Sequence, residues 1–138
     1  MIRGTLIHPE ILGALGTAGH GSTILIADGN YPFVTGTNPA AKHVYLNFAP
    51  GLLNATDVLR VLATAIPIEA ALVMAPDNAP EPSIFADFRQ LLPGLELTTT
   101  SRFPFYEAAK DASTALVIAT GEQRVYANIL LTIGVIMP

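Results

Sequence analysis

Apolar residues along this chain follow two different spacings, and the first is a set of short continuous runs. These runs lack polar alternation and are rich in β-branched residues, which is typical of strands buried on both faces of a sheet. They predict strands over residues 22–27, 70–74, 115–119 and 129–131, with shorter candidates at 44–46 and 96–99.

The second spacing places apolar residues three and four positions apart, as on a helix with one buried face. Capping residues and prolines mark where these helices start and stop. The pattern predicts helices over residues 9–18, from residue 54 to before Pro67, over 84–92 and over 104–111. Strands that alternate with helices indicate an α/β fold. We therefore expect a layered α/β/α domain over residues 1–138, with a largely parallel central sheet.

One stretch fits neither spacing. Residues 29–53 are rich in Gly, Pro and Asn, and contain only the short candidate strand at 44–46. Loops of this length are usually functional or lie at an interface.

The composition adds an expectation about assembly. Hydrophobic residues make up 51% of the 138 residues and charged residues only 13%, so an isolated monomer has little polar surface to cover its core. We expect a homo-oligomer. A membrane span is the rival explanation, but Pro67 and Glu69 interrupt the longest apolar stretch and no uncharged run reaches about 18 residues. We therefore expect a soluble protein.

The sequence gives little support for nucleic acid, a metal or a nucleotide as a partner or cofactor. The seven Lys and Arg residues are not clustered and the net charge is -4, which disfavours nucleic acid. The histidines and carboxylates lack metal-ligand spacing, and no glycine-rich phosphate loop precedes a helix, so we expect neither a metal nor a nucleotide cofactor. The absence of cysteine and of a secretory signal pattern makes the cytoplasm the expected location.

The first candidate for chemistry is the histidine of Gly19-His20-Gly21, just before the first predicted strand. Histidine is the side chain that ordinarily titrates near neutral pH, so His20 can give or take a proton. The end of the preceding helix would favour its protonated form. A purely structural role for the two glycines, which end a helix and start a strand, is about equally plausible.

Asp28 directly follows the same apolar strand. We expect it at the carboxyl edge of the sheet, where α/β folds bind ligands. Its carboxylate can accept hydrogen bonds from ligand hydroxyls, or it can cap the Gly29-Asn30 turn.

Two further candidates lie near the C-terminus. Tyr126 and Asn128 are two residues apart, so an extended backbone would direct both side chains to one face and one ligand. A phenol can relay a proton, and a carboxamide can both donate and accept hydrogen bonds. Packing at a strand edge is the alternative.

The segment Arg102-Phe103-Pro104-Phe105-Tyr106-Glu107 mixes charge and aromatic rings. Arg102 and Tyr106 could contact a polar ring that has an apolar face. The alternatives are a surface ion pair of Arg102 with Glu107 or Asp111, and a half-exposed helix position for Tyr106.

In their order and spacing, these stretches resemble the fucose mutarotase and ribose pyranase (RbsD/FucU) family of sugar-anomer isomerases. The Arg102 segment is nearer to the fucose branch, and the resemblance extends from Gly4 to Val135. It implies that His20 is the proton donor. The substrate contacts that it implies are those of Asp28, Arg102, Tyr106, Tyr126, Ala127 through its backbone, and Asn128.

The resemblance also implies ring-shaped assemblies, commonly decamers, in which a neighbouring subunit completes each site without metal or cofactor. Two departures leave the sugar open: Ser22 stands where the fucose branch often has an acid, and residues 35–51 match poorly.

The expected activity is therefore exchange of the anomers of a fucose-like or related pyranose, with His20 and Tyr126 as proton carriers. Two alternatives remain. The same pocket could belong to a non-catalytic monosaccharide-binding or regulatory module, or to an isomerase or lyase of another small polar metabolite.

Overall fold

One six-stranded sheet organises the protein. The structure, a computed structural model, describes residues 1–138. Its elements in chain order are α1 (Pro9–Thr17), β1 (Thr23–Ala27), β2 (Lys42–Tyr45), α2 (Ala55–Leu62), β3 (Ile68–Met74), α3 (Ile84–Leu91), β4 (Leu97–Thr100), α4 (Arg102–Lys110), β5 (Thr114–Ala119) and β6 (Ile129–Ile133). The predicted elements are all present, within a few residues of their expected bounds.

The strand order is β2-β5-β1-β6-β3-β4. Strand β6 is antiparallel to both of its neighbours, β1 and β3, while the remaining strand pairs are parallel. The prediction of a largely parallel sheet is therefore confirmed, with β6 as the exception. Because β6 runs the opposite way, its start lies at the same edge of the sheet as the carboxyl ends of the other strands.

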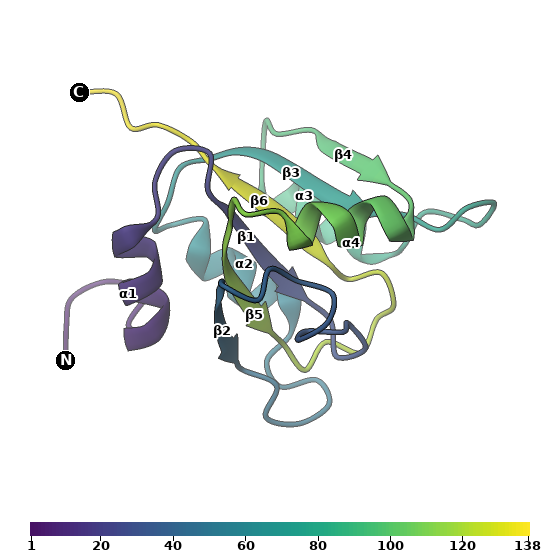
Figure 1. Ribbon diagram of the computed structural model, residues 1–138, viewed down its shortest axis with the longest axis horizontal. Helices are drawn as coiled ribbons and strands as arrows, with labels where there is room; N and C mark the ends of the chain where they lie inside the picture. Colours follow the sequence, from purple (N-terminus) through teal and green to yellow (C-terminus); the bar gives the residue numbers. More distant parts are fainter.

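Helices cover both faces of the sheet, which confirms the α/β/α layering. Figure 1 shows α4 in front of the sheet and α2 and α3 behind it. The larger core cluster joins the sheet to α1, α2 and α3, and a smaller cluster joins the other face to α4 through Phe105 and Ala109. None of the four helices combines the length and apolar character needed to cross a bilayer.

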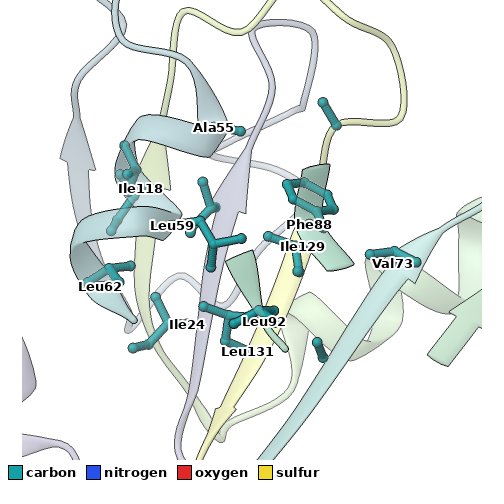
Figure 2. Packing of buried hydrophobic residues seen from close by; sticks show 14 of the residues in the cluster. Ile24, Ala55, Leu59, Leu62, Val73, Phe88, Leu92, Ile118, Ile129 and Leu131 are labelled. Atoms are coloured by element: carbon teal, nitrogen blue, oxygen red, sulfur yellow. The ribbon is translucent and has the colours of Figure 1, made fainter. Parts of the chain in front are cut away.

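Strand β1 shows why the continuous apolar runs occur. All five of its residues are buried, with Ile24 and Ile26 in one core cluster and Leu25 and Ala27 in the other. In Figure 2, Leu59 and Leu62 of α2 lie near Ile24, and Phe88 of α3 lies next to Ile129 of β6. A strand buried on both faces leaves no position for polar alternation.

Candidate functional site

A hollow of about 340 Å³ opens at the carboxyl edge of the parallel strands, a size within the usual range for small-molecule sites. It contains five of the seven predicted site residues. Its lining consists of Asp28, Asn30, Tyr31, Met74, Arg102, Tyr106, Val125, Tyr126 and Asn128.

Asp28 follows β1 directly, at the edge where it was expected, and only 3% of it is exposed. Its carboxylate accepts hydrogen bonds from the backbone N–H of Asn30 (2.9 Å) and of Ala127 (3.2 Å), and from the Asn128 side chain (3.0 Å). Three of its roughly four acceptor positions are thus used within the protein. Turn capping and lining of the hollow, foreseen as alternatives, occur together.

Burial raises the pKa of the Asp28 carboxyl above its ordinary value, and the charge of Glu122 raises it further. The three hydrogen bonds oppose this rise only in part. Asp28 therefore keeps its proton to a higher pH than an exposed aspartate, and it ties the segment that carries Tyr126 and Asn128 to the end of β1.

Residues 120–128, between β5 and β6, are held by a second buried carboxylate. Glu122 is 3% exposed and accepts hydrogen bonds from the Arg124 guanidinium (2.8 and 3.0 Å) and from the backbone N–H of Ala55 (3.3 Å) at the start of α2. Arg124 also donates to Asp87 of α3 at 2.7 Å. This network fixes the segment to the helices behind the sheet.

Burial opposes ionisation of Glu122, but the hydrogen bonds and the charge of Arg124 outweigh it and lower the pKa of the Glu122 carboxyl. Glu122 is therefore an ionised, structural carboxylate. Sequence reasoning missed the network because its partners lie on three separate elements.

Tyr126 enters the hollow from an unusual backbone conformation. Its φ is 60°, in the left-handed region, and β6 begins only at Ile129. The extended backbone that we expected for Tyr126 and Asn128 is therefore wrong, although both residues line the same hollow. The left-handed turn at Tyr126, rather than strand alternation, brings them together.

Arg102 is the first residue of α4, and its guanidinium donates a hydrogen bond to the Tyr126 phenol oxygen at 3.4 Å. It makes no ion pair within 4 Å, whereas Glu107 pairs with Lys110 instead. The surface ion pair considered for Arg102 is absent, and the guanidinium remains available to a ligand.

Tyr106 packs edge-on against Tyr31, with ring centroids 5.3 Å apart. Burial raises the pKa of the Tyr31 phenol well above its usual value, and its hydroxyl donates to the Gly36 carbonyl at 2.8 Å. Tyr31 is thus a neutral wall of the hollow, and Tyr106 and Tyr126 are the other two phenols that line it. Phe105, by contrast, is fully buried in the core.

His20 does not line the hollow of its own chain. It precedes β1 whereas Asp28 follows it, and the strand between them separates the two residues by roughly 15–20 Å. Its side chain is 60% exposed, and its Nε2 lies 3.1 Å from both carboxylate oxygens of Glu69. Any meeting of His20 with Tyr126 therefore requires two copies of the chain.

Ala127 does not line the hollow, and the contact of its backbone with a substrate, which the resemblance implies, stays a prediction. Its side chain is buried, and its N–H donates to Asp28. The lining residues that sequence reasoning did not single out for the site are Asn30, Tyr31, Met74 and Val125. Met74 ends β3 at the same sheet edge, a position that could have been found only with the strand order in hand.

Comparison with known proteins gives a consistent set of relatives. The model of the RbsD / FucU transport protein family matches residues 1–136. D-ribose pyranase 2 of Streptomyces griseus is 30% identical over 142 residues, which covers 98% of each chain. Fucose mutarotase of Bos taurus is 32% identical over 142 residues, covering 96% of this chain and 92% of the relative.

The fold is also shared with a solved structure. The structure of RbsD of Bacillus subtilis complexed with D-ribose superposes with a TM-score of 0.87 and 27% identity over 99% of this chain and 100% of the other. The six-stranded architecture described above is therefore that of a known sugar-binding protein.

Proposed function

The chain belongs to the RbsD/FucU family of sugar pyranose mutarotases, and we propose that it is an isomerase that interconverts the anomers of a fucose-like or related pyranose. The observation that carries this proposal is the hollow at the sheet edge. There a phenol, a guanidinium, a carboxamide and a buried carboxylate converge in a chain whose relatives are named D-ribose pyranase and fucose mutarotase.

Anomer exchange makes modest chemical demands. A proton leaves the anomeric hydroxyl, another reaches the ring oxygen as the C1–O5 bond breaks, and the open carbonyl turns before the ring closes on its other face. Two placed proton carriers suffice, and general acid and base catalysis typically contributes about 10²- to 10⁴-fold. The reaction requires neither a metal nor a cofactor.

The roles follow from the geometry. Tyr126 relays a proton on one side of the sugar, and the Arg102 guanidinium that contacts its oxygen holds the phenol and a sugar hydroxyl. The Asn128 carboxamide accepts from the Asp28 backbone N–H at 2.8 Å and donates to the Asp28 carboxylate, which leaves one N–H of its amide for the ligand. Asp28 has about one acceptor position left for a hydroxyl. Tyr106 supplies an aromatic wall, and the Ala127 backbone completes the contact surface.

His20 is the second proton carrier in this proposal, and it comes from a neighbouring copy. Its distance from the hollow of its own chain and its exposure support a site shared between subunits. We propose a homo-oligomer, with a ring-shaped decamer as the expected form.

The first test is NMR exchange spectroscopy with fucose, ribose, galactose and rhamnose in parallel. The protein should accelerate exchange between the anomeric signals of at least one sugar. His20→Ala should reduce this acceleration by at least about 10²-fold while the circular dichroism spectrum stays unchanged. Full activity of His20→Ala would remove His20 from the mechanism.

Mixing two inactive variants tests whether the site is shared. His20→Ala and Tyr126→Phe each lose one proton carrier, but a mixed assembly contains some interfaces that carry both. Activity should therefore reappear after the two variants are dissociated and reassembled together. If His20 and Tyr126 acted within one chain, the mixture would stay inactive.

One observation favours a second candidate, a sugar-binding module without catalysis: the hollow of a single chain contains no histidine. Such a protein would bind a monosaccharide, lose affinity on Asp28→Ala, and leave the anomeric exchange rate unchanged. The same NMR experiment separates the two functions.

A further inference from the structure

A carboxylate holds the ring of His20 from another strand. Glu69 lies 49 residues away in the sequence, in β3, and both of its oxygens are 3.1 Å from the His20 Nε2. Because the contact is to Nε2, the Nδ1 atom of the ring is left without a partner in the structure. The pair thus distinguishes the two nitrogens of the ring.

Glu69 owes its position to a β-bulge. In the pairing of β3 with β6, Ile68 is opposite Ile133 and Ala70 is opposite Thr132, so Glu69 is an extra residue on β3 with no partner of its own. Bulges re-aim a side chain and are common beside active sites. The bulge occurs at the one residue of β3 that reaches His20.

Backbone contacts around the pair fix both partners. The Gly21 N–H donates to the Ile133 carbonyl at 3.0 Å, which attaches the glycine turn of His20 to the end of β6. Gly21 has a φ of 82°, a conformation that side chains rarely adopt. A Cβ at Gly134 would lie 3.4 Å from the Glu69 Oε2, so the glycine also leaves room for the carboxylate.

We propose that Glu69 is a positioning residue for His20, holding the Nε2–H so that Nδ1 is the atom that exchanges a proton with the sugar. This inference rests on the proposed function, since it concerns the same reaction. Glu69 does not touch the substrate; it acts through the imidazole.

The proton balance is simple. In the charged ring, Nε2–H donates to Glu69 and Nδ1–H gives its proton to the sugar ring oxygen, which takes the electron pair of the breaking C1–O5 bond. The neutral ring keeps Nε2–H on Glu69 and offers the Nδ1 lone pair. The anomeric hydroxyl proton passes at the same time to the Tyr126 phenol oxygen as that phenol releases its own proton to water, which leaves the open carbonyl. On ring closure both transfers reverse: Nδ1 takes the O5 hydroxyl proton back, and a proton returns through Tyr126 to the carbonyl oxygen. The Glu69 carboxylate keeps its hydrogen bond to Nε2–H in both states of the ring and so holds the ring orientation, as in other carboxylate–histidine pairs.

The test compares Glu69→Gln with Glu81→Gln, because Glu81 is a similarly exposed carboxylate that pairs with Arg89 away from the hollow. Glu69→Gln should lower kcat by about 10- to 100-fold, less than a fully buried orienting carboxylate would, with KM changed less than about threefold. Glu81→Gln should leave both constants unchanged.

A double-mutant cycle separates positioning from a structural role. In the His20→Ala background, Glu69→Gln should have no further effect, because the ring through which it acts is gone. A fall in activity of the same size in both backgrounds, or wild-type kcat in Glu69→Gln, would overturn the inference.

A spectroscopic measurement keeps this inference distinct from the proposed function. Long-range ¹⁵N–¹H spectra of the neutral His20 ring report which nitrogen carries the proton, with no need for turnover. The wild type should show the Nε2–H form alone, and Glu69→Ala a mixture of both forms. If the two proteins give the same spectra, the positioning role is wrong. If instead no sugar is exchanged by the wild type, the proposed function fails while this readout still decides the role of Glu69.

Discussion

At Tyr126 the backbone adopts a left-handed conformation, which costs a residue with a side chain about 1–2 kcal/mol. Such strain persists only where the surroundings hold it, and it gathers at functional sites. Here Ala127 and Asn128 are anchored to Asp28 on one side, and Glu122 and Arg124 anchor the other. The left-handed backbone that these contacts hold directs the Tyr126 phenol into the hollow.

Tyr126→Phe isolates the contribution of the hydroxyl. The ring and the backbone stay in place, so the free energy of unfolding should change by less than about 0.5 kcal/mol. The exchange rate should fall about 10²- to 10⁴-fold, because one proton carrier is lost. Both quantities can be measured by NMR exchange spectroscopy and urea denaturation. Tyr45→Phe, at an exposed phenol outside the hollow, is the control and should keep full activity.

The positions of some site residues could be predicted from the sequence, and those of others could not. The place of Asp28 followed from its strand, since a charge cannot stay inside a run buried on both faces. We predicted that Tyr126 and Asn128 lie in the same site, but from an extended backbone that the structure does not have. No local sequence pattern indicates that a tyrosine adopts the left-handed conformation. The contact of His20 with Glu69 depends on the pairing of β3 with β6, which no local pattern encodes.

Among the elements, the segment of residues 120–128 depends most on one buried group. Glu122 connects it to α2 and, through Arg124, to α3. Removing the charge of a buried carboxylate leaves its partner donors without a strong acceptor.

Glu122→Gln should therefore reduce the free energy of unfolding by about 2–4 kcal/mol at pH 7, measured by urea denaturation. Glu81→Gln breaks an exposed pair and should cost less than about 1 kcal/mol. An equal loss of unfolding free energy in the two variants would show that the Glu122 network stabilises the fold no more than an ordinary surface ion pair does.

The contribution of Glu122 to folding stability depends on pH, and the direction of its pKa shift gives the sign of that dependence. The folded state lowers the pKa of Glu122, so its stabilising contribution is complete above the ordinary value of 4.5 and is lost as the pH falls through the lower folded value. The stability of the wild type should therefore fall more steeply below pH 4.5 than that of Glu122→Gln.

The element pattern itself was predictable for a physical reason. Helices and strands are set by local spacing and capping, so their order and approximate bounds follow from the sequence. The reversed direction of β6 was not predictable, because the connection over residues 120–128 is irregular and strand direction depends on its path. For the same reason the sequence indicated a loop over residues 29–53 without showing which of its residues line the hollow.

On the scale of the whole molecule, two exposed apolar side chains lie beside the hollow. Val125 lines it and is 63% exposed, and Phe103, which packs edge-on against Tyr106, is 73% exposed. Exposed apolar residues beside a site can form part of an interaction surface, and we expect a neighbouring copy to cover these two. This arrangement supports a neighbouring copy at the hollow, while the cytoplasmic location and the single-domain organisation stay predictions.

Val125→Asp should therefore weaken assembly at least about tenfold, because it places an unpaired charge in an apolar contact. Light scattering should show a smaller particle, with exchange activity lost in parallel. Gln90→Asp adds the same charge at an exposed position of α3, on the other face of the sheet, and should leave particle mass and activity unchanged. A Val125→Asp protein of unchanged mass would place the interface elsewhere.

The central position of β1 has a consequence for synthesis. Leu25 pairs with Val117 on one side and with Leu130 on the other, so both neighbours of this early strand are made near the end of translation. At about 5–20 residues per second, some 90 residues take roughly 5 to 20 s to emerge. During that interval the nascent chain carries an unprotected apolar segment, and a ribosome stalled before residue 114 would hold a ready substrate for chaperones.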